Sequence, residues 1–146
     1  MIERFQYYIN ENLVRKCTPN KAEAKSFMER AAARLEYINQ QRITESSASF
    51  IFEDIYEAIR EAGQALMELK GYKPYSHEAV IAFLKEFFTF STYDISIFNR
   101  YRVLRNKIVY RTEHISVQTC KDALTFLKHF LPIVKTEFEK TVKPIH

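Results

Sequence analysis

The sequence predicts an all-α protein, an antiparallel bundle of four to five main helices, on three grounds. A chain of 146 residues with 47% hydrophobic content is long enough for one domain with its own core, and too short for two. Only two glycines and four prolines leave little material for the tight turns of an all-β fold. Apolar residues recur at helical spacing along most of the chain, whereas no strand pattern, internal repeat or low-complexity segment is visible. We therefore expect residues 1–146 to form a single helical domain.

Two helices are expected first. Ile2–Arg15 predicts a short helix with one apolar side, so residues 1–16 would form an N-terminal helical extension. The second helix has two competing starts. At Thr18-Pro19, threonine is a good N-cap and proline suits the first helical position. Asn20, with a glutamate three residues later, is the alternative start. From either start the helical periodicity continues to about Arg42.

A third helix follows a polar link, and Ser47 and Ser49 are alternative N-caps for it. Gly63 lies in its middle, where a glycine costs about 1 kcal/mol relative to alanine. Gly63 therefore indicates either close backbone contact at this point or a tolerated exposed position. Gly71 is expected to end the helix in the left-handed conformation, with Pro74 blocking any continuation.

Serines mark the remaining helices. Ser76 is the expected cap of the next one, and Ser91–Asp94 forms a turn or a new cap before a helix that ends at 110–112. Ser116 is the expected cap of a last helix that reaches about Thr141. The spacing assigns to the core, among others, Phe27, Met28, Phe52, Ile55, Ile59, Leu66, Val80, Phe83, Leu84, Leu127, Leu131 and Val134.

Charge and composition limit the function classes. The formal charge is +4 and the pI is about 9.0, which mildly favours an acidic partner such as nucleic acid. Cys17 and Cys120 match neither a disulfide framework nor a zinc site, and their number is typical of a reducing cytoplasm. No P-loop, Rossmann glycines or metal-ligand spacing is present, so we expect neither a metal nor a cofactor. The N-terminus does not resemble a signal peptide, and the most apolar stretch, 79–90, is too short to span a bilayer. We expect a soluble cytoplasmic protein with no membrane segment.

Ile97–Arg111 is the most informative stretch. Wound as a helix, it brings polar residues three or four apart onto one stripe, opposite a core-facing apolar stripe. The polar stripe consists of Asn99, Arg102, Asn106 and Tyr110, and the apolar stripe of Ile97, Tyr101, Leu104 and Ile108. Arg105 lies between the two stripes. A solvated helix face normally mixes charges, but no acid occurs between Ile95 and Thr112.

This basic, amide-bearing and aromatic surface is suited to hold a phosphate or a base. The residues expected to contact nucleic acid or nucleotide are Asn99, Arg102, Arg105, Lys107 and Arg111. A structural alternative exists for Arg105, because a partly buried arginine needs a partner, here Glu53, Asp54 or Glu57. For Arg102 the alternative is a plain solvated face.

The segment Leu104–Tyr110, Leu-Arg-Asn-Lys-Ile-Val-Tyr, resembles the late-helix signature of the HEPN family. HEPN domains are small helical domains found with nucleotidyltransferases and in many RNA-cleaving toxins. The family motif is Arg, often followed by Asn, then four to six intervening residues, then His. Arg105 and Asn106 match its first two positions, and Tyr110 stands at the His position. The stretch Gly71–Ala79 and the long final helix are also similar to the family.

The resemblance implies a homodimer in which two motif helices face each other across the axis and form a shared basic cleft. It also implies metal-independent RNA cleavage, with Arg105, Asn106 and Tyr110 at the catalytic positions. Tyr110 cannot supply an imidazole, because a phenol has a pKa of about 10. It would donate a hydrogen bond, stack on a base, or serve as an interface aromatic. His114 is a further candidate base. His77, at a helix start, and His129 are weaker candidates.

Two functions follow as expectations. The first is a HEPN-like dimer that binds RNA or nucleotide and is a toxin-type ribonuclease by resemblance. The second is a non-catalytic binding module that partners a separate nucleotidyltransferase, as in a toxin–antitoxin pair.

Overall fold

The structure is a computed structural model that describes residues 1–143. Its elements in chain order are α1 (Phe5–Asn10), β1 (Val14–Lys16), α2 (Lys21–Asn39), α3 (Ala48–Lys70), β2 (Tyr72–Pro74), α4 (His77–Phe87), α5 (Thr92–Arg111) and α6 (Val117–Val142). Most of the described chain is helical, which confirms the predicted all-α class. None of the helices in this part of the chain combines the length and the apolar character that a membrane crossing requires.

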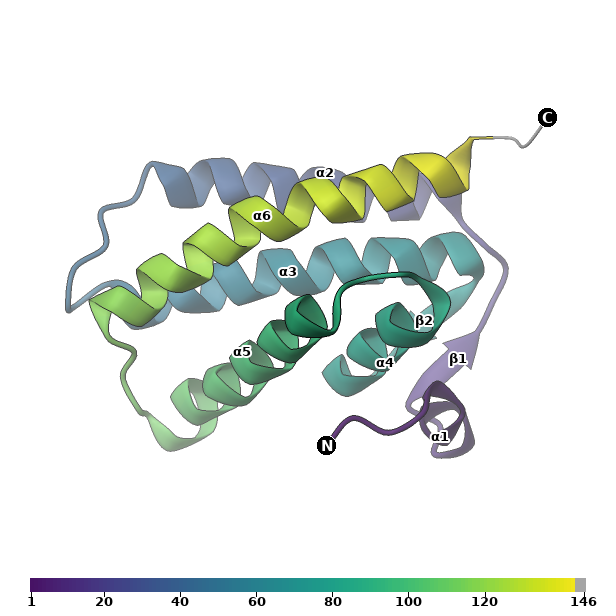
Figure 1. The fold of residues 1–146 in the computed structure, drawn as a ribbon, viewed down its shortest axis with the longest axis horizontal. Helices are drawn as coiled ribbons and strands as arrows, with labels where there is room; N and C mark the ends of the chain where they lie inside the picture. The colour runs from purple at the N-terminus through teal and green to yellow at the C-terminus, as the bar shows by residue number, and fades with distance from the viewer. Residues whose placement is uncertain (144–146) are drawn as a thin grey trace.

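The helix α3 is the centre of the bundle and contacts α2, α4, α5, α6 and β2. Figure 1 shows α2 and α6 along one side of α3, and α4 and α5 along the other. Neighbours joined by short connections run antiparallel, as α2 does to α3 and α5 to α6, whereas α3 and α6 run in the same direction. Nearly all of α3 between Ile55 and Glu68 is buried, as expected of a helix that is covered on every side.

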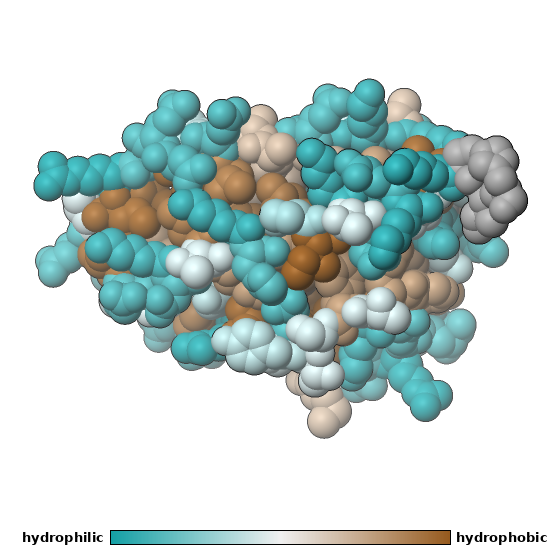
Figure 2. Space-filling view, turned by 45° about the horizontal axis from the view of Figure 1, so that its top comes forward, coloured by the Kyte–Doolittle hydropathy of each residue, from teal (hydrophilic) through white to brown (hydrophobic). Residues whose placement is uncertain are grey.

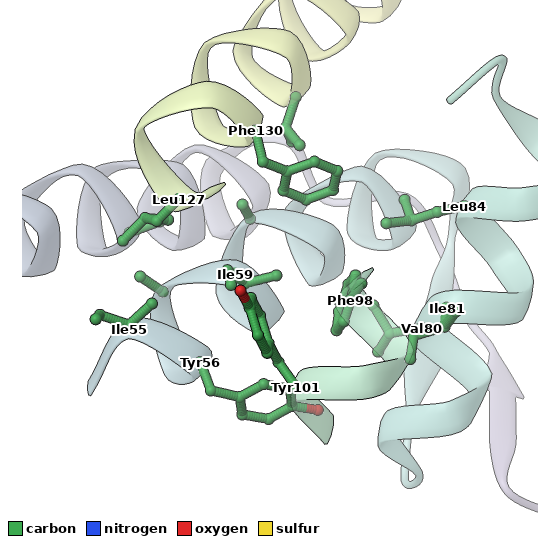
Figure 3. Close-up of a cluster of buried hydrophobic side chains, with 14 of the residues drawn as sticks. Ile55, Tyr56, Ile59, Val80, Ile81, Leu84, Phe98, Tyr101, Leu127 and Phe130 are labelled. Carbon is green, nitrogen blue, oxygen red and sulfur yellow. The ribbon is translucent and has the colours of Figure 1, made fainter. Parts of the chain in front are cut away.

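Gly63 lets α3 and α4 approach closely. A Cβ atom at this position would lie 2.7 Å from Val80 Cγ1 and 3.3 Å from Leu84 Cδ1. The sequence-based expectation of close contact is therefore confirmed, and the alternative of an exposed glycine is wrong. Figure 3 shows the surrounding core, in which side chains such as Ile59, Phe98 and Phe130 converge from α3, α5 and α6.

Most expected helix boundaries are confirmed by their caps. Ser91 and Ser116 accept hydrogen bonds from the backbone N–H groups of Asp94 and Thr119 at 3.0 and 3.1 Å. Gly71 ends α3 with φ +82°. The Thr18-Pro19 start is wrong, because α2 begins one residue after its cap Asn20, whose side chain accepts from the Glu23 N–H. That helix ends at Asn39, short of the predicted Arg42.

The N-terminal segment differs most from the prediction. The helix expected over Ile2–Arg15 covers only Phe5–Asn10, because the backbone turns at Asn12 with φ +58°. The chain then forms β1, which pairs antiparallel with β2, although no strand was expected. Three-residue strands are too short to give an alternating sequence pattern. The strand pair continues at Tyr75, whose N–H donates to the Leu13 carbonyl at 2.8 Å, and so fixes the entry into α4.

The face formed by α2 and α6 is seen in Figure 2, where apolar residues show between hydrophilic side chains. A groove of about 560 Å³ lies between these two helices, with Met28, Leu35 and Leu131 among its lining residues. Charged residues, among them Lys25, Glu29 and Lys135, also line this groove, and none of its lining residues belongs to Ile97–Arg111.

Candidate functional site

A small cleft of about 310 Å³ lies between the start of α4 and the C-terminal half of α5. Its lining consists of Tyr75, Ser76, His77, Glu78, Arg102, Arg105, Asn106 and Tyr110. We call it the Arg105 cleft. Half of these residues belong to the stretch that the sequence singled out. The other half come from the β2–α4 junction, which the strand pair holds in place.

Arg102 already has partners within the chain. Its Nε donates to Asn99 Oδ1 at 3.0 Å, and one terminal nitrogen donates to Glu78 Oε1 at 3.4 Å. Only 13% of its side chain is exposed, so the alternative of a plain solvated face is wrong for Arg102. The Tyr8 hydroxyl donates to the other Glu78 oxygen at 3.2 Å. No acid occurs in α5 after Asp94, and Glu78 of α4 supplies one to Arg102, which is therefore a fixed and partly neutralised cation.

Arg105 is the cation of this cleft that has no acidic partner among residues 1–143. It is half-buried, yet it forms no ion pair within 4.0 Å with any described residue. Two of the acids considered as its partner are engaged elsewhere, since Asp54 pairs with Arg34 and Glu57 with Arg60. The structural bridge proposed as the alternative role of Arg105 is thus absent among residues 1–143. A half-buried guanidinium without a carboxylate is suited to receive an anion.

His77 brings an imidazole into the same cleft. Its Nδ1 lies 3.0 Å from the hydroxyl of Tyr56, a fully buried residue of α3, and the two rings stack with centroids 5.6 Å apart. Burial, and then the positive charges of Arg60 and Arg105, lower the pKa of His77 to about 4. Burial also raises the pKa of Tyr56, so the pair is neutral near pH 7.

The tautomer of His77 decides what the ring offers to a ligand. If Tyr56 donates to Nδ1, the proton of the ring is on Nε2, and the imidazole is a hydrogen-bond donor. If Nδ1–H donates to Tyr56, Nε2 is a free acceptor and a general base. Either way, a neutral ring does not compete with Arg105 as a cation.

Aromatic rings stand at the cleft's mouth. Tyr110 is 76% exposed and Tyr75 is 59% exposed, although both line the cleft. Exposed tyrosine rings beside a guanidinium are suited to stack on bases while the cation holds a phosphate. Asn106 adds an amide that both donates and accepts hydrogen bonds.

Some of the predicted residues do not reach the cleft. Lys107 and Arg111 lie on the same helix but do not line it, and Asn99 acts only through Arg102. His114 lies in a different hollow, beside Glu45 and Gln118.

The chain turns away from the cleft after α5. Thr112 has φ +53°, and the N–H of Ile115 donates to Ser49 Oγ at 2.9 Å, which holds the segment against α3. This geometry does not bring His114, the further candidate base, toward Arg105.

The residues that α4 contributes to the cleft were largely missed from the sequence. His77 was a weak candidate, and Glu78 was not a candidate at all. The one available signal was the resemblance of Gly71–Ala79 to the same family as the motif, which connects the two segments.

Among the described residues, no group of three or more His, Cys, Asp or Glu side chains is arranged to hold a metal ion. No protein-family model, curated protein or solved structure matches this chain.

Proposed function

We propose that this chain is a HEPN-like cytoplasmic protein that binds RNA or a nucleotide through the Arg105 cleft. The observation that carries the proposal is the half-buried guanidinium of Arg105, which has no carboxylate partner in the described part of the chain and shares a cleft with His77 and Tyr110. A phosphate oxygen would accept from the guanidinium, and a base would stack on a tyrosine ring. Because Glu78 offsets part of the charge of Arg102, one strong phosphate contact is expected rather than several.

The test is a titration of fluorescently labelled single-stranded RNA, read by anisotropy. Arg105→Gln removes the free cation and should weaken binding about tenfold or more, the usual worth of a charged hydrogen bond. Arg42→Gln is the matched control, because Arg42 is exposed, lies in the α2–α3 connection and is outside the cleft. Equal losses in both variants would mean that RNA binds through net charge alone, which would contradict the proposal.

The proposal includes ribonuclease activity, in which His77 would act as the general base. In metal-independent cleavage the ribose 2′-oxygen loses its proton to a base and attacks the adjacent phosphorus. The bond from phosphorus to the 5′-oxygen breaks, and that oxygen takes up a proton, leaving a cyclic 2′,3′-phosphate and a 5′-hydroxyl. His77 is the imidazole in the cleft that would take the proton from the 2′-hydroxyl, and Tyr110 would donate a proton to the departing 5′-oxygen. Arg105 would stabilise the charge on the phosphate oxygens.

The non-catalytic alternative has an observation in its favour as well. A pKa of about 4 makes His77 a weak base at neutral pH, and Tyr110 stands where the family has histidine. The domain would then bind nucleotide and partner a separate nucleotidyltransferase, as in a toxin–antitoxin pair. Incubation with RNA in EDTA separates the two. Cleavage abolished by both Arg105→Gln and His77→Gln supports the enzyme, whereas RNA binding without cleavage supports the binding module.

We further propose that the chain forms a homodimer through α5. The polar stripe of α5 does not support this dimer, because Arg102 and Asn99 are hydrogen-bonded to each other within one chain. The support comes instead from apolar residues exposed on α5 beside the cleft, namely Val103 and Val109, together with Tyr110. Such side chains are suited to an interface that brings two Arg105 clefts close together.

Sedimentation at micromolar concentration tests the assembly. A dimer is expected for the wild type, and a monomer for Val103→Glu. A monomeric wild type would contradict the shared cleft. RNA binding by a single chain would not be affected by that result, because the anisotropy titration tests it separately.

A further inference from the structure

A second cleft is larger than the Arg105 cleft. It is a cleft of about 850 Å³ between the first half of α5 and the middle of α6. Its α5 residues, which include Ile97 and Tyr101, belong to the stripe opposite the one that lines the Arg105 cleft. The size is within the range of about 300–1,000 Å³ that is usual for small-molecule sites. We call it the Tyr101 cleft.

The Tyr101 hydroxyl has no hydrogen-bond partner among residues 1–143. The side chain is only 5% exposed, and its ring packs edge-on against Phe52 and Phe126, with centroids 5.5 and 5.8 Å away. Figure 3 shows the ring rising from α5 into the core. The hydroxyl forms no hydrogen bond with any residue from 1 to 143. It is not among the fully buried polar atoms of these residues that lack a partner, so it keeps contact with solvent and is open to a ligand. Burial raises the pKa of Tyr101, so the group stays protonated and able to donate into the cleft.

A second polar pair stands in the same cleft. Asp94 is 4% exposed, and both of its carboxylate oxygens lie within hydrogen-bond distance of His129 Nε2, at 3.2 and 3.1 Å. This pair fixes the imidazole beside the ring of Phe126, with ring centroids 6.2 Å apart, and Nδ1 has no hydrogen-bond partner among residues 1–143. The buried acid thus holds a planar ring at the cleft in one orientation.

The charges of the cleft come close to cancelling. Arg100 lines it and has no ion pair within 4.0 Å among the described residues. Asp122 also lines it and accepts from the side chain of Gln118 at 2.8 Å. With Asp94 and His129 included, two acids face one arginine and one imidazole. Neither an anion nor a cation is strongly favoured, so the suited ligand is neutral.

We propose that the Tyr101 cleft binds a neutral planar heteroaromatic ring that carries a hydrogen-bond donor and an acceptor on one edge. Phe126 and Ile97 provide the apolar walls for the faces of such a ring. The Tyr101 hydroxyl would donate to its acceptor, and Asp122 would accept from its donor. Nucleobases have this chemistry, whether in a free nucleoside or in an RNA strand. The inference does not depend on the Arg105 cleft, because the two sites use opposite faces of α5.

Nucleosides test the proposal, because they carry the ring without the phosphate that Arg105 would bind. The protein is titrated with adenosine, guanosine, cytidine and uridine, and binding is followed by NMR shifts of residues lining the Tyr101 cleft. At least one nucleoside should bind at millimolar concentration or below. Tyr101→Phe should weaken it about five- to tenfold by removing one hydrogen bond, while keeping the buried ring. Arg105→Gln is the control and should leave nucleoside binding unchanged.

A short single-stranded RNA distinguishes the two sources of the ring. If the same resonances shift at lower RNA concentration than nucleoside concentration, the cleft takes a base from a strand; if not, it takes a free nucleoside. Both results support the proposal. Absence of binding by all four nucleosides at millimolar concentration would overturn it. Binding that Tyr101→Phe does not weaken, or that moves with Arg105→Gln, would also overturn it, because the ring would then lie elsewhere.

Discussion

His77 should make the folding free energy depend on pH in a defined direction. Its pKa is about 4 in the folded chain, against an ordinary value of 6.5. Between these values the unfolded chain binds a proton that the folded chain does not, so acid favours unfolding. The stability linked to His77 is therefore fully present above pH 6.5 and is lost as the pH falls toward 4. The full shift corresponds to about 3 kcal/mol, which partial solvent exposure of the ring reduces to about 1–2 kcal/mol.

The assay compares urea unfolding of wild type and His77→Gln, followed by far-ultraviolet circular dichroism. Glutamine keeps a hydrogen-bonding group near Tyr56 but does not titrate in this range. Between about pH 7.5 and about pH 5, the wild type should lose about 1 kcal/mol more unfolding free energy than the variant. Carboxylates contribute equally to both proteins and cancel in the difference. An identical loss in both would refute the lowered pKa of His77, and with it the neutral ring in the Arg105 cleft.

Two further predictions concern the core. Gly63→Ala should lower the unfolding free energy by about 1–2 kcal/mol, because the clash with the buried side chain of Val80 outweighs the gain in helix propensity. Unchanged or increased stability in urea would contradict this, because it would show that α4 can shift away from the added methyl group at no cost in free energy. Glu61→Gln should cost about 2–3 kcal/mol, because its fully buried carboxylate pairs with Arg34 at 2.9 Å and with the more exposed Arg30 at 3.2 Å. Glu53→Gln, on the same helix and without such a pair, is the control and should leave the urea midpoint nearly unchanged.

Local chemistry explains why the helix boundaries were largely predictable. Ser91, Ser116 and Gly71 each satisfy backbone groups within a few residues of themselves, so their effect is visible in the sequence. At the start of α2 two such signals lie side by side, and the side-chain hydrogen bond of Asn20 decides between them. The strands β1 and β2 have no local signal, because each depends on a partner far along the chain.

The candidate site was predictable only on one side. Helical periodicity already places Arg102 and Asn106 on one face of α5, with Arg105 beside them. Their surroundings depend on how α4 packs against α5. The spacing of residues within α5 carries no information about that packing. Sequence proximity misled in the case of His114, whose segment is held against α3 by the bond from Ile115 to Ser49. His77, much earlier in the chain, lies in the cleft instead.

The most direct test of the central claim is to observe Arg105 itself while RNA binds. The side-chain Nε–H resonances of the arginines are assigned by NMR, and the protein is titrated with a short single-stranded RNA. The Arg105 resonance should shift and saturate with the RNA concentration, together with the ring signals of His77 and Tyr110, while that of Arg42 stays unchanged. RNA binding that shifts other parts of the protein and leaves Arg105 unaffected would contradict the account.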